Sequence, residues 1–293
     1  MLTKVKFNRF NVLTNALLCK MQQHEWPGKY RFYQWFSKRF GDHIIQHQLG
    51  KKAFVVPVDE WCFWLEFGPQ NYYLNEFVPF FDIINAYEQE FIFIDLGADI
   101  GTVSALANAY CPKLLNIIAF EPNPQSYNLL HTNLSNINKP SLGINAAVSD
   151  FVGKASFNHS TTSTIDHEGH IDLTKEGNTA VTSLDAWFAQ NEIKLPLLVV
   201  LKIDVEGQED AVFRGAQHLL KQCQNCVVLL EIHPDVLSAS NMQAEHLFEQ
   251  AEAIRPLTWM VPLLGNQIVN RDLPLFDQVP RGQYDIIGVS SIN

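Results

Sequence analysis

The segment from Phe91 to Gly101, F-I-F-I-D-L-G-A-D-I-G, constrains the fold of this chain more than any other. Four apolar residues of high β-propensity lead to Asp95, and Gly97 and Gly101 follow in a short turn. Residues 102–110, behind the turn, have the composition of a helix. This order is typical of a buried parallel strand that leads through a glycine turn into a helix. Because glycines let backbone N–H groups approach a ligand, the segment predicts a binding site at the end of the strand.

A second acid follows one strand later, since the mainly apolar strand expected at residues 116–120 ends at Glu121. An acid at that place is positioned to bind ribose hydroxyls, which indicates a nucleoside. A dinucleotide-binding turn normally reads G-x-G-x-x-G, but Asp99 stands where the middle glycine would be. A carboxylate there would repel a pyrophosphate and attract an ammonium group. The turn therefore favours S-adenosylmethionine, which has a ribose, an amino group and a sulfonium but no phosphate, over a nicotinamide dinucleotide.

Strand and helix patterns alternate along the chain, which predicts a doubly wound, mostly parallel α/β sheet with ligands at the carboxyl ends of its strands. We expect further parallel strands at 143–148, 195–203 and 226–232. We expect helices at 124–134, 184–190, 208–221 and 241–254. An antiparallel pair, at 259–264 and 284–289, can close the sheet. The remaining expectations are a helix at 30–40, a hairpin at 51–67, a helix at 73–88, an edge hairpin at 154–158 and a mobile loop at 158–180.

Charged residues also mark the ends of two later strands. The sequence K-I-D-V-E-G places Lys202, Asp204 and Glu206 at the end of the first, and E-I-H places Glu231 and His233 at the end of the second. Alternation along a strand puts Lys202 and Asp204 on one side, and likewise Glu231 and His233. Charges on a central strand are costly unless they are paired or functional. They therefore indicate either a site or an ion-pair network that stabilises the sheet edge.

Composition and charge narrow the class of protein. No apolar run approaches the roughly 18 residues of a membrane-spanning helix, and we expect no signal peptide. Five cysteines at irregular spacing indicate reduced thiols and a cytoplasmic protein. Residues 1–60 contain ten Lys or Arg and four Asp or Glu, against eleven and twenty-seven in the remainder. The acidic remainder would repel nucleic acid. The basic N-terminal part is expected either to pack as a helix on the main domain or to dock an acidic partner, membrane headgroups or a second subunit.

The joint order of these motifs resembles a known family. D-L-G-A-D-I-G, A-F-E-P-N-P, A-A-V-S-D, T-S-L-D, L-K-I-D-V-E-G-x-E and L-E-I-H follow one another over roughly residues 90–235. This order is similar to that of the FkbM-type S-adenosylmethionine-dependent methyltransferases, which methylate hydroxyls of small molecules and sugars. The resemblance implies a Rossmann-like methyltransferase domain at residues 89–293. Residues 1–88 would then form a helical and hairpin extension on the substrate or partner side.

The resemblance also implies roles for single residues. It assigns cofactor binding to Asp95, Gly97, Asp99, Gly101, Glu121, Asn123, Ala147, Ser149 and Asp204. Of these, the turn residues would hold the methionine moiety, Glu121 the ribose, Ala147 with Ser149 the adenine edge, and Asp204 would face the methyl group. The family commonly has asparagine where this chain has Asp99, a change that could alter the contact with the methionine end.

An alcohol nucleophile needs its proton removed as the new bond forms, which requires a base. His233 suits that task by its ordinary pKa class and its expected place at a strand end. Asp204 and Glu206 are the alternatives. A divalent cation held by Asp204, Glu206 and Glu231 would also acidify the hydroxyl, but we expect no metal. Two other readings remain, a non-catalytic binding module of the same fold and a nicotinamide-dependent dehydrogenase or epimerase. The acceptor is expected to be a small molecule or a sugar.

Overall fold

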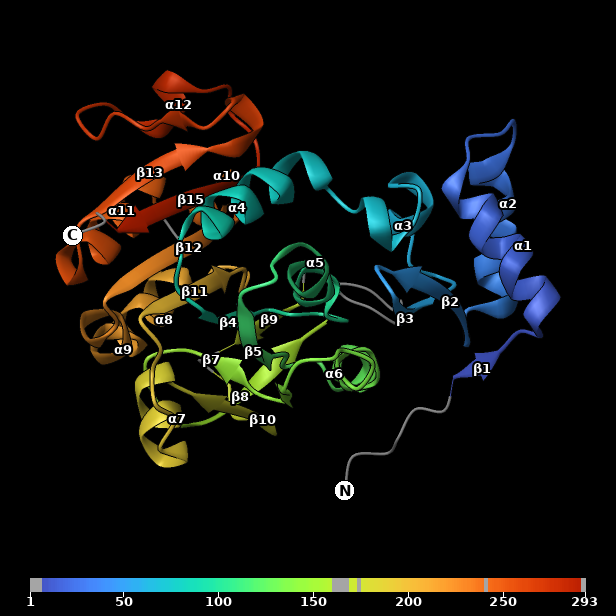
Figure 1. Ribbon diagram of the computed structural model, residues 1–293, viewed down its shortest axis with the longest axis horizontal. Coiled ribbons are helices and arrows are strands. Elements are labelled where there is room, and N and C mark those ends of the chain that lie inside the picture. The colour runs from blue at the N-terminus through green and yellow to red at the C-terminus, as the bar shows by residue number, and fades with distance from the viewer. Residues whose placement is uncertain (1–6, 160–168, 173–174, 240–241, 291–293) are drawn as a thin grey trace.

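The computed structural model describes residues 7–159, 169–172, 175–239 and 242–290. At its centre lies an eight-stranded sheet in the order β14-β13-β15-β12-β11-β4-β5-β6 (Figure 1). Five neighbouring strands are parallel: β4 (Phe91–Leu96), β5 (Leu114–Phe120), β6 (Ser141–Ile144), β11 (Leu198–Ile203) and β12 (Asn225–Ile232). The sheet is completed by antiparallel pairing of β15 (Tyr284–Ser290), β13 (Leu257–Val261) and β14 (Gln267–Ile268). The predicted fold class, including the antiparallel closing pair, is confirmed.

The central strands are continuous apolar runs because helices cover both faces of the sheet. Every residue of β4 and β11 is buried. Alternate residues of β4 enter different cores: Phe91 and Phe93 pack in one, and Ile92 and Ile94 in the other. The first core is covered by α4 (Leu74–Ala86), α5 (Thr102–Tyr110) and α6 (Pro124–Leu134). The second is covered by α7 (Leu184–Asn191), α8 (Glu209–Gly215), α9 (Gln217–Gln222), α10 (Pro234–Ala239) and α11 (Ala244–Ile254).

The N-terminal residues form a separate small sheet with its own helices, on the right in Figure 1. The sheet contains β1 (Asn8–Arg9), β2 (His43–Leu49) and β3 (Lys52–Pro57), and the helical segments are α1 (Val12–Gln23), α2 (Lys29–Phe40), α3 (Cys62–Leu65) and η1 (Pro69–Asn71). The helix predicted at 30–40 is confirmed, and it buries Phe36 against the first core. The hairpin predicted at 51–67 is wrong. The observed hairpin lies earlier in the chain, where β2 pairs with β3 around a turn at Gly50, which has φ +59°. Residues 62–65 form a helix instead of a strand.

A four-stranded sheet in the order β7-β10-β8-β9 lies beside the main one. It contains β7 (Ala147–Val148), β8 (Gly153–Asn158), β9 (His170–Asp172) and β10 (Thr179–Thr182). The single strand predicted at 143–148 is therefore wrong, because its two halves belong to different sheets. The loop predicted at 158–180 is wrong for residues 158, 170–172 and 179–180, which are in strands. Residues 160–168 and 173–174 of it lie outside the described residues.

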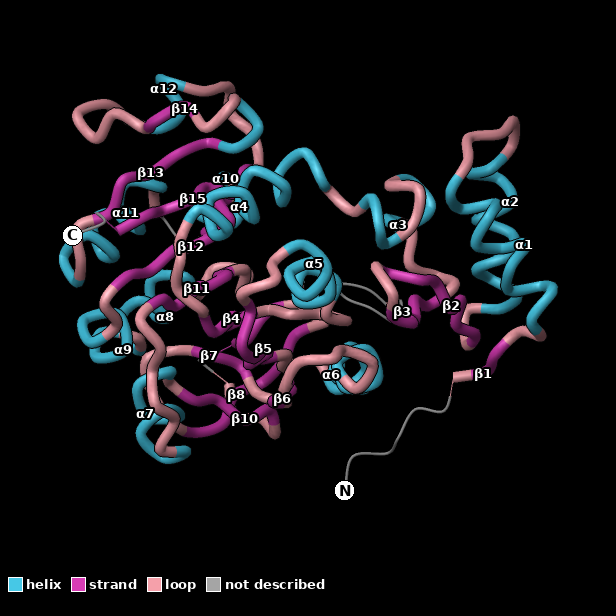
Figure 2. The backbone as a smooth tube through the Cα atoms, in the orientation of Figure 1, coloured by secondary structure: helices cyan, strands magenta, loops and turns pink. Residues whose placement is uncertain are grey.

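Two further elements differ from expectation or were not expected. The helix predicted at 208–221 is two helices, α8 and α9, separated at Ala216. The chain after β13 adds η2 (Pro262–Leu264) and α12 (Leu275–Gln278) at the closing edge, where Figure 2 shows long loops between short elements. Among the described helices, none has both the length and the apolar character needed to cross a membrane. The parallel strands place their carboxyl ends along one edge of the main sheet, and this edge carries the site.

Candidate active site

A cavity of about 900 Å³ opens at the carboxyl ends of the parallel strands. Most of the site residues predicted from the sequence line it: Gly97, Asp99, Glu121, Ala147, Ser149, Asp204, Glu206 and His233. Asp95, Gly101 and Asn123 are not in its wall and support it from behind. Asp95 is fully buried and accepts a hydrogen bond from Ser104 Oγ at 2.6 Å. Asn123 caps α6 by accepting from the Gln125 N–H at 3.0 Å.

Gly97 brings the turn after β4 against the end of β11. Its φ is +67°, and a Cβ on this residue would lie 1.7 Å from the carbonyl oxygen of Asp204. Only glycine satisfies both the left-handed backbone and the close approach. The Gly97 carbonyl also accepts a hydrogen bond from Lys202 Nζ at 3.2 Å. The glycine therefore fixes the distance between the two strand ends that face the cavity.

Glu121 lines the cavity beside this turn. Its two carboxylate oxygens accept hydrogen bonds from the backbone N–H groups of Asp99 at 2.8 Å and Asn123 at 2.7 Å. Each oxygen retains capacity for a second donor, such as a hydroxyl. Burial, and then the negative charge of Asp99, raise the pKa of Glu121 to about 8. The two hydrogen bonds thus fix the position of the Glu121 side chain, and its raised pKa favours the uncharged, protonated carboxyl group at neutral pH.

Asp99 occupies a left-handed backbone position, with φ +49°. Asparagine and aspartate tolerate this conformation better than other residues with a side chain. The conformation directs the Asp99 N–H to Glu121. A carboxylate at this position adds negative charge to the cavity wall beside Glu121, which an amide would not do.

Lys202 connects the strand ends by ion pairs. Its Nζ lies 2.8 Å from Asp204 Oδ2 and 3.8 Å from Asp95 Oδ1. Burial alone would lower the pKa of Lys202, but the carboxylates of Asp204 and Asp95 outweigh it and raise the pKa. The ion pairs of the predicted alternative are therefore present at Lys202, whereas a role limited to stabilising the sheet edge stays a prediction. The same network holds Asp204 in the cavity wall.

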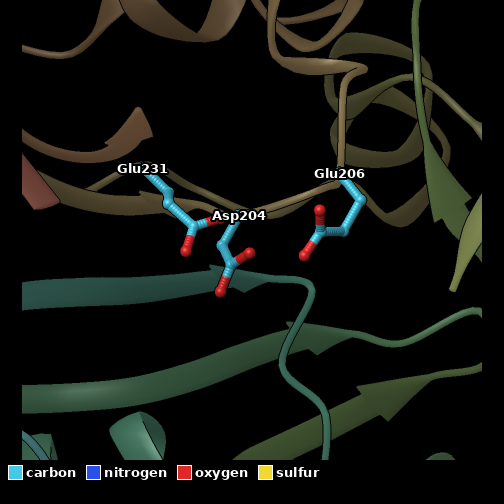
Figure 3. Close-up of side chains that lie close together, drawn as sticks. All are labelled: Asp204, Glu206 and Glu231. Atoms are coloured by element: carbon cyan, nitrogen blue, oxygen red, sulfur yellow. The ribbon is translucent and has the colours of Figure 1, made fainter. Parts of the chain in front are cut away.

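Asp204, Glu206 and Glu231 gather three carboxylates from two strand ends (Figure 3). One oxygen from each lies within 4.8 Å of the others. Glu206 reaches this position through a left-handed backbone with φ +51°, and Glu231 accepts a hydrogen bond from Gln283 Nε2 at 2.5 Å. Burial, and then the neighbouring Asp204, hold the pKa of Glu231 well above its ordinary value. Three oxygen ligands of this kind can hold a divalent cation, or they can share protons among themselves.

His233 follows β12 and lies in the same part of the wall. The N–H of Val236, at the start of α10, points to His233 Nδ1 at 3.5 Å. This contact is too long to hold the ring in one tautomer.

Several residues of the wall were not predicted. Trp61, Tyr72, Tyr73 and Glu76 come from the N-terminal 88 residues, and Asp285 comes from β15. Asp285 pairs in register with Glu231 across the antiparallel strands. Burial, and then Glu76 and Asp204, raise the pKa of Asp285 to about 7. The sequence could have indicated Asp285, because an antiparallel strand that pairs with β12 begins beside the carboxyl end of β12.

Comparison with known proteins gives a match at this domain. The family model described as "Methyltransferase FkbM domain" matches residues 95–254. The curated hexuronic acid methyltransferase AglP of Haloferax volcanii is 27% identical over 154 residues, which are 53% of this chain and 61% of that protein. The matched part is thus less than two thirds of that relative.

Among solved structures, the methyltransferase FkbM of Methylobacillus flagellatus KT is similar with a TM-score of 0.42 and 14% identity. The match covers 68% of this chain and 43% of that one. The precorrin-6y C5,15-methyltransferase of Geobacter metallireducens GS-15 has a TM-score of 0.39 and 15% identity, over 73% of this chain and 87% of that one.

Proposed function

The chain belongs to the methyltransferase FkbM family, and on that premise we propose that it transfers a methyl group from S-adenosylmethionine to a hydroxyl group of a sugar. The observation that supports this proposal best is Glu121, whose buried carboxylate is held at the end of β5 beside the glycine turn of β4. A carboxylate at that place is suited to the two hydroxyls of a ribose. The name of the curated relative supports a sugar as the acceptor.

The residues present fit this cofactor. Gly97 lines the cavity without a side chain, and Asp99 of the same turn offers a carboxylate to an ammonium group. Ala147 and Ser149 line the same side and would contact the adenine edge. When bound, S-adenosylmethionine supplies an electrophilic methyl group on a sulfonium. Asp95, Gly101 and Asn123 would act by holding the turn and the start of α6 in place.

The chain must also align the acceptor and remove its proton. We assign the proton to His233, with Asp204 and Glu206 as the alternative bases. Asp204 lines the cavity and is held by Lys202, so it would orient the acceptor hydroxyl. His233 would accept the hydroxyl proton and pass it to water, while the methyl group would leave the sulfonium sulfur for the acceptor oxygen and the sulfur would keep the electron pair as a neutral thioether. Alignment of this kind can supply several kcal/mol of rate enhancement.

Two measurements test the proposal. Calorimetric titration should show binding of S-adenosylmethionine and none of NAD, and Glu121→Ala should weaken binding by roughly 10- to 100-fold through lost charge-assisted hydrogen bonds. Labelled S-adenosylmethionine should then label a sugar in a panel of glycosides, with the methyl group on oxygen by nuclear magnetic resonance. Binding of NAD in place of S-adenosylmethionine would reject the cofactor. Cofactor binding without any methylated product would instead identify a non-catalytic module.

A further inference from the structure

We propose that α1 and α2 form a docking surface for a membrane whose lipids carry negative charge, so that the protein binds reversibly to a lipid surface. This inference goes beyond the proposed methyl transfer and does not depend on which acceptor is used. Among the described residues that line the cavity, none belongs to either helix. The docking surface is therefore separate from the candidate active site.

Both helices expose large apolar side chains. Val12 and Leu13, at the start of α1, are the most exposed large apolar residues in the described part of the chain, at 84% and 83%. Leu17 of α1 and Tyr30 and Trp35 of α2 are each more than half exposed. Single exposed apolar residues are common on protein surfaces, but a group of them usually marks an interaction surface.

Apolar and basic residues share the outward side of each helix. Residues spaced by three or four positions lie on one side of a helix. Exposed residues recur at this spacing in both helices, and they are Leu13, Leu17 and Lys20 of α1 and Arg31, Trp35 and Lys38 of α2. The opposite sides enter the first core through Leu18 and Phe36. Figure 1 shows both helices at one end of the longest axis, so the two outward sides are exposed at that end of the molecule.

The charge of these helices indicates the partner. Together α1 and α2 contain five Lys or Arg and no Asp or Glu. Four of the five basic residues are exposed, namely Lys20, Arg31, Lys38 and Arg39. Residues 61–293, in contrast, contain eleven Lys or Arg and twenty-seven Asp or Glu. An anionic surface therefore attracts the two helices and repels the rest of the chain, which orients the protein with the helices toward that surface.

A lipid surface fits this mixture of residues better than an acidic protein or a second copy of the chain. Basic side chains bind anionic headgroups, while leucine and tryptophan side chains between them reach the boundary of the acyl region. Tryptophan and tyrosine are enriched at this interface because each has an apolar ring and a polar group. Attraction by an acidic protein would account for the basic residues only. A second copy docked symmetrically would bring like charges together.

The test is sedimentation of the protein with vesicles of phosphatidylcholine, with and without phosphatidylglycerol. We expect binding to the anionic vesicles to be about tenfold or more tighter than to the neutral ones, and to weaken as salt is added. Trp35→Ser, and Arg31→Gln combined with Lys38→Gln, should each weaken binding to the anionic vesicles by about tenfold. Ile268→Ser in β14 and Lys221→Gln in α9 change exposed residues of the same kinds and should leave binding unchanged. Thermal denaturation checks that each variant folds like the parent.

Four outcomes would overturn the inference. The first is no binding to the anionic vesicles, and the second is equal binding to the neutral ones. The third is binding that depends on Arg31 and Lys38 but not on Trp35, which would indicate an acidic partner. The fourth is self-association in sedimentation velocity that Trp35→Ser abolishes, which would make the two helices an interface between copies. None of the four requires methyl transfer to be measured, so they are distinct from failure of the proposed function.

Discussion

At the scale of single residues, the cavity wall holds carboxylates close together, and neighbouring carboxylates oppose one another's ionisation. Glu121 is fixed by two backbone N–H groups, but Asp99 beside it opposes its ionisation. A ribose hydroxyl and the positive charges of the cofactor would both favour the ionised form of Glu121. Cofactor binding should therefore release a proton from this residue near neutral pH.

This arrangement predicts a specific dependence of stability on pH. The folded protein holds the proton of Glu121 up to about pH 8, whereas the ordinary value is 4.5. The stabilisation from this group is thus fully present below pH 4.5 and is lost as the pH rises through about 8. Chemical denaturation at a series of pH values should show that the parent loses more stability over this window than Glu121→Gln, by on the order of a few kcal/mol. Asp99→Asn should move the window to lower pH. Identical pH dependence in the parent and in Glu121→Gln would contradict the prediction.

The base is tested by a second substitution. A general base contributes roughly 10²- to 10⁴-fold, so His233→Ala should lose turnover on that scale while still binding the cofactor. His218→Ala, an exposed histidine of α9, is the matched control. If His233→Ala keeps full turnover, Asp204 becomes the candidate base, and if chelation abolishes activity that Mg²⁺ restores, the carboxylates are metal ligands.

At the scale of elements, the turn between β4 and α5 determines how the parallel strands meet. Gly97→Ala would place a methyl group 1.7 Å from the Asp204 carbonyl oxygen, so the end of β11 must move. We expect a loss of cofactor affinity of tenfold or more and a loss of stability of roughly 1–3 kcal/mol. Gly28→Ala is the control, since Gly28 also has a positive φ, at +87°, but no neighbouring atom of the described residues lies within 4 Å of its Cβ position. Calorimetry and thermal denaturation of both variants measure the difference. Equal effects would show that backbone strain alone is responsible.

The sequence predicted those elements whose limits are set locally. The helices at 102–110 and 124–134 have the expected ends because a glycine turn precedes the first and a capping asparagine followed by proline begins the second. Buried strands β4, β11 and β12 were clear from their continuous apolar runs. The acids at their ends could therefore be expected to meet at one edge of the sheet.

Elements whose limits depend on distant contacts were missed. The predicted strand 143–148 breaks because Asn145 Nδ2 donates to the carbonyls of Glu121 at 2.8 Å and Pro122 at 3.1 Å. The helix predicted at 208–221 breaks because the Asp185 carboxylate accepts hydrogen bonds from the backbone N–H groups of His218 and Leu219, both at 2.8 Å. Glu76 was missed for the same reason, since its place in the site follows from docking of α4, whereas Asp285 could have been placed from the pairing of the predicted closing strand with β12.

At the scale of the whole molecule, the N-terminal sheet is connected to the cofactor turn through one side chain. Asn133 of α6 accepts from the Val55 N–H at 2.8 Å through Oδ1, and its Nδ2 donates to the carbonyls of Val55 at 3.0 Å and Ile100 at 2.9 Å. Ile100 lies in the glycine turn, so β3 and this turn share a buried hydrogen-bonding partner. The first core also extends continuously from Ile45 to Phe93. The division at residues 88 and 89, and docking of a partner by the basic N-terminal part, stay predictions.

This connection gives the last prediction. Asn133→Leu keeps a similar volume but leaves one N–H and two carbonyls of the buried backbone without their partner. Each unsatisfied group costs about 1–3 kcal/mol, so the variant should lose several kcal/mol of stability in chemical denaturation. Because the Ile100 carbonyl belongs to the turn, cofactor affinity should fall as well. Asn128→Leu, at a partly exposed position of the same helix, should change both much less. A stability loss in Asn133→Leu without any change in cofactor affinity would show that the N-terminal sheet supports the fold but does not position the turn.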